Sequence, residues 1–257
     1  MKTHIIALIK IFDKEEYADA FIERGEMFCR TIGDFKVIED GEVRGDAYEG
    51  VTDWHQPDRV ELLISYTDID GTTKSFPLKD LAGPVVVQNS GHNDINVYCC
   101  YAVTVPDFNE SYETEEQRLF VFNKINKMLK MQTTLPSEVL SFGKFAVMIY
   151  RVQDFIDRVK STAMQEGKTL WRGTVKYFDS DTFHGSFDPI ESMFRKRNIY
   201  EYQREYRFAF GSKYSSGPMT IKLGSLKEIA FKLQTDEING KIQIKLDETS
   251  YKQQFSH

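Results

Sequence analysis

The sequence predicts a single α+β domain over residues 1–257, in which strands outnumber helices. Short apolar runs of strand length recur along the whole chain, whereas only three longer segments have the 3.6-residue period of an amphipathic helix. The strands are spaced too irregularly for a doubly wound parallel sheet. No internal repeat, low-complexity segment or proline-rich linker divides the chain, so we expect one domain.

The first predicted elements are a strand at residues 4–12 and an amphipathic helix at residues 13–24. Asp13 stands where a capping residue is expected at the start of this helix, and Gly25 follows its last turn. Residues 26–32 have the length and apolar content of a short returning strand.

Residues 33–51 are rich in charge and glycine and predict a loop that is functional or mobile, because it is long for a simple connection. Beyond it, the turn signal Asp70-Gly71 separates two β-like runs at residues 60–66 and 73–78, which predicts a hairpin. Further strands are expected at residues 85–88 and 97–105.

The second half begins with a helix at residues 113–129, followed by a buried strand at 145–150 and an amphipathic helix at 153–165. The remaining expected elements are a strand at 173–178, a loop at 180–187, a helix-like segment at 190–197, and strands at 201–210, 219–223, 229–233 and 241–246.

The composition is that of a soluble globular protein, with 41% hydrophobic and 28% charged residues. A net charge of −6 argues against a broad basic footprint for nucleic acid. No apolar stretch is long enough to span a bilayer, and residues 5–9 are too short for a signal-peptide core. The three cysteines, Cys29, Cys99 and Cys100, form no disulfide framework, so we expect a reducing cytoplasm and no membrane association.

Several common chemistries lack their motifs in this chain. There is no Gly-x-Gly-x-x-Gly and no P-loop, so a nucleotide must be held in another way. The five histidines have no metal-ligand spacing, and we predict no metal. The chain contains neither Gly-x-Ser-x-Gly nor a cysteine beside a histidine, so it has no motif that predicts nucleophilic catalysis.

The most informative segment is the aromatic run at residues 200–208, which contains Gln203 and Glu205. Residues two apart on a strand point to one face, so an amide and a carboxylate would meet the same ligand. Such a carboxylate is suited to stabilising an oxocarbenium ion at an anomeric carbon. The structural alternative is an edge strand with a solvated polar face and a buried face formed by Tyr202, Tyr206 and Phe208.

Two blocks of sequence together suggest a family. The first runs from Phe21 through Cys29-Arg30-Thr31 to Phe35, continuing to Glu39 and to Arg-Gly-Asp-Ala-Tyr-Glu-Gly at residues 44–50, and the second covers residues 194–207. They resemble bacterial proteins, often encoded near phage-defence genes, that look like divergent relatives of the ADP-ribosyltransferases. One of these is an RNA-modifying toxin of a toxin–antitoxin–chaperone system.

The resemblance implies an ADP-ribosyltransferase-like split β-sandwich with peripheral helices around an NAD cleft. Glu205 matches the catalytic glutamate of that family, and Gln203 matches the position two residues before it. Lys10 ends the first strand, where the family has a basic residue or histidine, and His4 on the same strand competes for this role. Cys29-Arg30-Thr31 occupies the place of the second motif of the family, and Thr31 is its only hydroxyl. This departs from the family pattern, since neither its usual arginine nor an intact Ser-Thr-Ser is present.

The resemblance also implies roles for these side chains. Glu205 would accept a hydrogen bond from the 2′-hydroxyl of the nicotinamide ribose, and Gln203 would orient the acceptor. Lys10 and Arg44 would face the pyrophosphate or ribose, and Tyr48 or Tyr202 would stack on nicotinamide. Structural alternatives are a solvated Lys10 at the end of its strand, an Arg44–Asp46 pair across the loop, and a core position for Tyr202.

The function expected from this resemblance is NAD-dependent ADP-ribosyltransfer by a defence-system toxin, with NAD as substrate and no metal. The acceptor would be RNA, DNA or protein, and a cognate antitoxin is a further expected partner. One alternative is an interaction protein of a bacterial defence system that has lost catalysis. Another is a hydrolase that uses Asp46, Glu49 and Glu205 as paired carboxylates.

Two spatial expectations follow from the transferase interpretation. The strands that carry Lys10 and Glu205 should lie side by side in the sheet, although almost 200 residues separate them. The loop at residues 33–50 should border the cleft.

Overall fold

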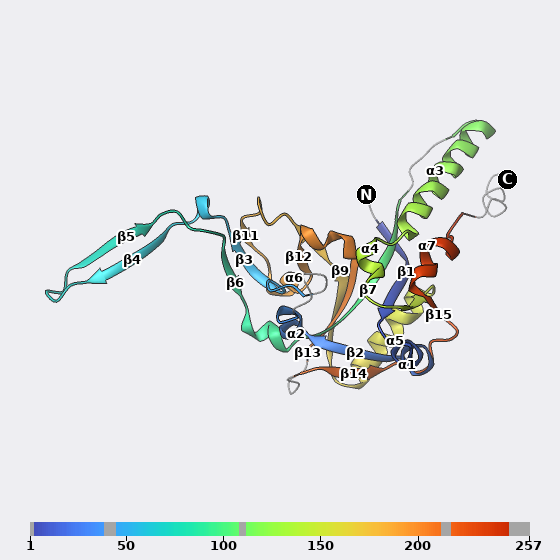
Figure 1. The fold of residues 1–257 in the computed structure, drawn as a ribbon, viewed down its shortest axis with the longest axis horizontal. Coiled ribbons are helices and arrows are strands. Elements are labelled where there is room, and N and C mark those ends of the chain that lie inside the picture. Colours follow the sequence, from blue (N-terminus) through green and yellow to red (C-terminus); the bar gives the residue numbers. More distant parts are fainter. Residues whose placement is uncertain (1–2, 39–44, 108–111, 212–216, 247–257) are drawn as a thin grey trace.

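The computed structural model describes residues 3–38, 45–107, 112–211 and 217–246 as a mixed α+β domain with mostly antiparallel pairing (Figure 1). Its main sheet has eight strands among these residues. Six follow one another across the sheet: β14 (Met219–Lys222), β2 (Glu26–Thr31), β7 (Asn96–Pro106), β1 (Thr3–Phe12), β8 (Phe145–Ile149) and β15 (Ala230–Gln234). The other two are β13 (Glu205–Gly211), which pairs with β7, and β9 (Thr169–Thr174), which pairs with β13.

The long strand β7 divides the sheet. Along one edge it pairs with β13, and along the other it pairs first with β2, at Asn96 and Val97, and then with β1, from Tyr101 to Pro106. Between these two contacts, residues 98–100 pair with neither β1 nor β2. The remainder of β1 leaves β7 and continues along β8. The sheet therefore splits between β1 and β2.

One face of the sheet is covered by α1 (Glu15–Arg24) and α5 (Val152–Gln165). The alternation of β7 sends Tyr98, Cys100 and Ala102 into this core, where they pack with Phe21 of α1 and Phe155 of α5. Burial of these apolar and aromatic side chains is the main stabilising contribution of the layer.

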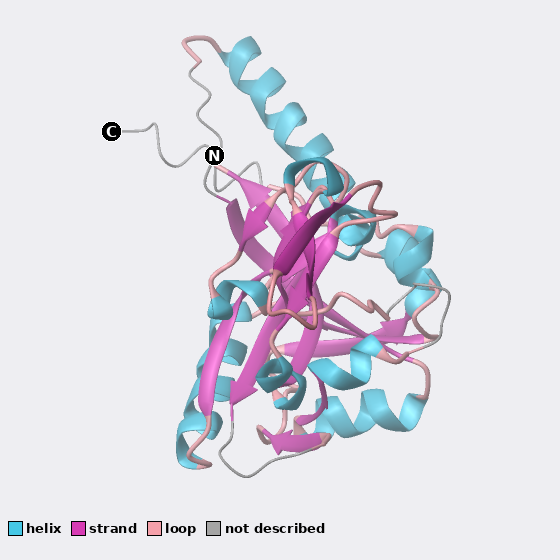
Figure 2. Ribbon diagram, turned by 90° about the vertical axis from the view of Figure 1, so that its left-hand side faces the viewer, coloured by secondary structure: helices cyan, strands magenta, loops and turns pink. Residues whose placement is uncertain are grey.

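The opposite face carries a smaller core beneath α4 (Ser137–Leu140) and α7 (Ile238–Lys241), into which β7 sends Tyr101 and Val103. The long helix α3 (Glu115–Thr133) projects beyond the sheet (Figures 1 and 2). Among the described residues no helix combines the length and the apolar content needed to cross a bilayer.

A second group of strands flanks the main sheet. It contains the three-stranded sheet of β11 (Gly185–Ser186), β3 (Val51–His55) and β6 (Val85–Gln88), and the parallel pair of β10 (Lys176–Phe178) and β12 (Arg195–Arg197). Trp54, Phe178 and Phe187 form its aromatic core. The predicted hairpin is present as β4 (Leu62–Thr67) and β5 (Thr73–Leu78), and it extends away from the rest of the molecule (Figure 1).

Several predicted elements differ from the structure. Helix α1 begins after Lys14, with no side-chain cap, rather than at a capping Asp13, whereas Gly25 ends it in the left-handed region as expected. The short helix α2 (Ile32–Lys36) occupies the start of the predicted loop. Residues 242–246 form no strand, and the segment at 190–197 divides into α6 (Pro189–Ser192) and β12.

The segment at residues 201–210 also differs from its prediction. Its first part is the 3-10 helix η3 (Asn198–Gln203), and strand β13 begins only at Glu205. Arg204 between them has a φ of 38°, in the left-handed region that breaks a strand. Gln203 and Glu205 are therefore not neighbouring positions on one strand face. The remaining 3-10 segments are η1 (Pro57–Arg59), η2 (Ser90–Asp94) and η4 (Thr235–Glu237).

Candidate functional site

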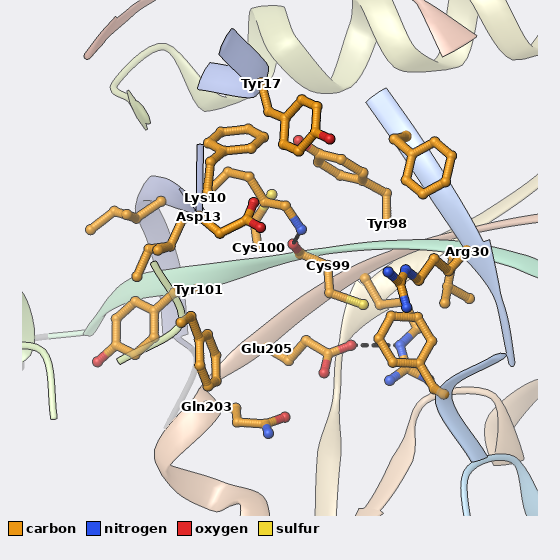
Figure 3. Close-up of a pocket in the computed structure, with 18 of the residues that line it drawn as sticks. Lys10, Asp13, Tyr17, Arg30, Tyr98, Cys99, Cys100, Tyr101, Gln203 and Glu205 are labelled. Carbon is orange, nitrogen blue, oxygen red and sulfur yellow. Dashed lines mark hydrogen bonds and ion pairs between the residues drawn. The ribbon is translucent and has the colours of Figure 1, made fainter. Parts of the chain in front are cut away.

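A cavity of about 790 Å³ lies at the split of the sheet. Residues of β1, β2 and β7 line it together with Gln203 and Glu205 (Figure 3). Arg207 also lines it. Strands β1 and β13 are not adjacent, because β7 lies between them, so the expectation that they lie side by side is wrong. Lys10 and Glu205 nevertheless line the same cavity.

The split explains how these two side chains reach one space. Ile9, Tyr101 and Glu205 share one rung across β1, β7 and β13 and therefore point to the same face of the sheet. Lys10, one residue further along β1, starts from the opposite face. Residues 98–100 of β7 pair with neither β1 nor β2, so the Lys10 side chain can extend into the gap between these strands. The cavity in this gap is also lined by Glu205.

Lys10 is held in the gap by two contacts. Its Nζ donates a hydrogen bond of 2.8 Å to the backbone carbonyl of Cys99 and lies 4.3 Å from the centre of the Tyr98 ring (Figure 3). An ammonium group has three donors, and among the described residues the Cys99 carbonyl uses one of them. His4, the competing candidate, does not line the cavity; it is exposed and contacts Asp107 at 2.6 Å.

Glu205 belongs to a buried cluster of charged side chains at the floor of the cavity. Its Oε1 accepts a hydrogen bond of 2.6 Å from Nε of Arg207, and its Oε2 accepts one of 3.0 Å from Nζ of Lys196. Glu49 completes the cluster, because its Oε1 lies 2.6 Å from Nη1 of Arg207 and its Oε2 lies 3.4 Å from Nζ of Lys196. All four side chains are at least 94% buried.

Lys196 also brings Gln203 into the site. Its Nζ donates to Oε1 of Gln203 at 2.9 Å, as it does to Glu205. The amide and the carboxylate therefore meet through a shared lysine from β12 and not through strand alternation. The turn at Arg204 and the 3-10 helix before it place Gln203 beside the start of β13.

The charges of the cluster keep Glu205 ionised. Burial alone raises the pKa of the Glu205 carboxyl, but Arg207 and Lys196 together outweigh burial and hold this pKa well below its usual range. Burial lowers the pKa of Lys196, and here the carboxylates of Glu205 and Glu49 outweigh it and raise the pKa. Glu205 and Lys196 thus stay in their charged forms because opposite charges lie within hydrogen-bond distance of each.

The other predicted contact residues lie elsewhere. Thr31 caps α2: its hydroxyl accepts from the backbone of Asp34 at 3.0 Å, while its own backbone donates to the Asp34 carboxylate at 2.8 Å. Tyr48 packs edge-on against Trp54, and Tyr202 packs against the core beneath α4. Neither they nor Thr31 line the cavity, and Arg44 lies outside the described residues.

The segment expected to border the cleft does so in part, since Phe35 and Ile38 line the cavity. Asp46 is buried and pairs with Arg197 at 3.1 Å. The Arg44–Asp46 pair considered from the sequence involves a residue outside the described ranges and stays a prediction. Neither Asp46 nor Glu49 lines the cavity. Of the three carboxylates in the hydrolase alternative, only Glu205 faces the space where a substrate would bind.

Sequence reasoning missed four residues that shape the site: Lys196, Arg207, Arg30 and Tyr98. Arg30 pairs with Val97, so by register its side chain starts on the same face as Glu205, and it is exposed at the cavity. The Tyr98 hydroxyl is buried and has no hydrogen-bond partner among the described residues. The alternation Glu205-x-Arg207 was the one available signal, because side chains two apart on a strand share a face.

Within the described residues there is no group of three or more histidine, cysteine, aspartate or glutamate side chains arranged to hold a metal ion. The site presents the ionised Glu205 carboxylate, the Gln203 amide and several basic side chains around one cavity, among them Lys10 and Arg30. Comparisons of the chain with protein-family models, with curated proteins and with solved structures found no match.

Proposed function

We propose that the protein is an NAD-dependent ADP-ribosyltransferase whose catalytic carboxylate is Glu205. The observation that carries this proposal is the position of an ionised, buried carboxylate at the floor of a cavity that passes through a split in the sheet. A volume of about 790 Å³ is within the range of small-molecule sites and suits a dinucleotide.

In the proposed reaction, the bond between nicotinamide and C1′ of the ribose breaks and nicotinamide leaves with the electron pair. The acceptor nucleophile then bonds to C1′ and loses its proton. Glu205 accepts a hydrogen bond from the 2′-hydroxyl and stabilises the positive charge that develops on the ribose. Arg207, Lys196 and the Cys99 thiol use three of its lone-pair sites, and a carboxylate has about four such sites, so one remains for a ligand.

Two cations lie on opposite sides of the split, Lys10 on β1 and Arg30 on β2. They are suited to the two phosphates of a dinucleotide because ammonium and guanidinium groups donate strong hydrogen bonds to phosphate oxygens. Gln203, which lines the same cavity, would orient the acceptor. The same proposal includes an acceptor that is RNA, DNA or protein. It also includes a cytoplasmic setting, a role as a defence toxin and control by an antitoxin.

The test is Glu205→Gln with Glu49→Gln as its matched control. Both variants remove one carboxylate from the same cluster, so both lose stability through unpaired buried cations, but only Glu205 lines the cavity. We expect nicotinamide release from NAD to fall by about a hundredfold or more in Glu205→Gln and by less than about tenfold in folded Glu49→Gln. Equal losses at matched fractions of folded protein contradict a catalytic role for Glu205.

A second candidate function is a binding module that retains this fold without catalysis. The observation that favours it is that each oxygen of Glu205 already contacts a basic side chain, which makes the cluster self-neutralising. Titration of the wild-type protein with NAD separates the two functions. Absence of both NAD binding and nicotinamide release contradicts the transferase proposal and favours the binding-module alternative.

A further inference from the structure

The β4–β5 hairpin leaves the domain as an isolated two-stranded ribbon (Figure 1). Among the described residues, its strands pair only with each other, and every residue of both strands except Leu62 is exposed. A two-stranded ribbon is at best marginally stable in water by itself, because it buries little apolar surface.

The side chains of the hairpin are divided between its two faces. By register, one face carries Leu62, Ile64, Tyr66, Phe76 and Leu78, with Lys74 opposite Tyr66 at its outer end. The opposite face is mainly hydroxyl-bearing, and Ser65 contacts Ser75 at 2.9 Å while Thr67 contacts Thr73 at 3.0 Å. This division is typical of a sheet with one covered face, yet Ile64 is 53% exposed and Phe76 55% exposed.

The two edges of the hairpin are not equivalent. The backbone N–H of Asp68 donates to the carbonyl of Thr72, which makes these two residues a hydrogen-bonded pair. Hydrogen-bonded and non-hydrogen-bonded pairs alternate along an antiparallel ladder, so Leu63 and Pro77 form a pair that does not exchange hydrogen bonds. The backbone groups of these two residues therefore point outward. Proline has no N–H, which weakens the outer edge of β5 for strand addition, whereas β4 presents Leu63, Ser65 and Thr67.

The charge of the ribbon indicates what covers it. Residues 57–80 contain five acidic side chains and three basic ones, a net charge of −2. The acidic residues are Asp58, Glu61, Asp68, Asp70 and Asp80, and the basic ones are Arg59, Lys74 and Lys79. A nucleic acid is disfavoured, because its phosphates require a basic surface. A protein surface with basic side chains around an apolar centre is complementary.

The apolar face of the ribbon is too small for two copies of this chain to form a stable dimer through it. Each strand has six residues. At about 3.4 Å per residue, with strands about 5 Å apart, one face measures roughly 20 by 10 Å. Two such faces packed together bury far less than the roughly 800 Å² per partner of a stable interface. The covering surface must reach the edge and the flanks of the ribbon as well as its apolar face.

We infer that the hairpin is a docking element for a different protein, which adds a strand to the outer edge of β4 and covers the apolar face with a groove flanked by basic side chains. Strand addition supplies main-chain hydrogen bonds, and the groove supplies pockets for alternate side chains. This inference does not depend on the proposed enzymatic function, because none of the hairpin residues lines the cavity.

The experiment uses the full chain with the photoreactive amino acid benzoylphenylalanine in place of Phe76, in an extract of the cells that encode it. The matched control carries the same group in place of Phe120, which is 71% exposed on α3. We expect one protein to be cross-linked through position 76 and not through position 120. That protein is then identified by mass spectrometry, purified and titrated against the unlabelled chain.

Three variants test the geometry of the complex. Ile64→Ser removes an apolar contact, and Ser65→Pro removes an outward N–H from β4, so each should weaken binding by about tenfold or more. Leu63→Ser is the control, because Leu63 has similar exposure, 58%, but lies on the opposite face. Its affinity should stay within about threefold of wild type. All three positions are exposed, so the melting temperature of the domain should not change.

Added salt should weaken the complex, because opposite charges flank the contact. The inference is overturned by cross-linking to nucleic acid, by equal losses in Ile64→Ser and Leu63→Ser, or by the absence of a partner specific to position 76. A dimer of this chain in light scattering that dissociates on Ile64→Ser also overturns it, in favour of a second copy.

Discussion

Lys196 connects more of the candidate site than any other single side chain described above. Its ammonium contacts Gln203, Glu205 and Glu49, which come from η3, β13 and the segment before β3. Such a buried charge is costly to desolvate, and its carboxylate partners offset that cost only while all of them are present. Lys196 therefore acts as a positioning residue that holds Glu205 and Gln203 toward one cavity.

Replacing Lys196 with methionine tests this role. The variant leaves Glu49 and Glu205 with Arg207 as their shared cation, and we expect a loss of about 3–5 kcal/mol in the free energy of unfolding. Lys232→Met is the control, because Lys232 also contacts two carboxylates, Glu15 and Asp19, but near the surface. Its expected cost is below about 1 kcal/mol. Urea unfolding at pH 7 measures both, and similar losses contradict the assignment of a buried cluster.

At the scale of the elements, most strands follow from their apolar runs. The runs around Leu8, Val103 and Val147 are recognisable because each buries a nearly continuous face in the sheet. The segment before β13 was not predictable in the same way. Its aromatic residues favour a strand, but Tyr200 hydrogen-bonds the carbonyl of Gly45, a contact across 155 residues that the local sequence does not encode.

The same limit applies to the candidate site. The sequence predicts site roles for Glu205 and Lys10, which line one cavity, but it does not predict roles for Lys196 and Arg30. Lys196 lies in a segment whose pattern favours a helix, and its role depends on partners at positions 49, 203 and 205. Spacing along the chain cannot predict such a group, because tertiary contacts between separate elements create it.

Helix α2 gives a test of Thr31, whose position in the sequence resembled a cofactor contact. Its side chain forms a capping box with Asp34, so Thr31→Ala should cost about 1 kcal/mol in the free energy of unfolding. Thr31→Ser retains the hydroxyl and should recover most of this loss. NAD affinity should be unchanged in both folded variants, because Thr31 does not line the cavity. An affinity loss in Thr31→Ala without a stability loss contradicts the capping role.

At the scale of the whole molecule, β7 organises both the core and the site. One side of the strand sends Tyr98 and Cys100 into the main core, and its other side sends Tyr101 into the smaller core. Residues 97–101, from both sides of the strand, line the cavity. The split that opens the cavity thus lies beside the most completely buried part of the protein. The stability of that core and the shape of the cavity depend on the same three residues, 98–100.

This arrangement predicts that the protein loses stability at alkaline pH. Burial raises the pKa of Cys29 and that of Cys100 to about 12, and it also raises the pKa of Cys99. In the unfolded chain these thiols lose their protons near pH 8.5, so above that pH the unfolded state binds fewer protons than the folded state. Stability must then fall as the pH rises from about 8.5 toward 12, by about 1.4 kcal/mol per pH unit for each thiol. Urea unfolding under reducing conditions between pH 7 and 10 measures this slope. The double variant Cys29→Ala/Cys100→Ala should lower the slope by about 3 kcal/mol per pH unit, whereas an unchanged slope contradicts burial of these thiols.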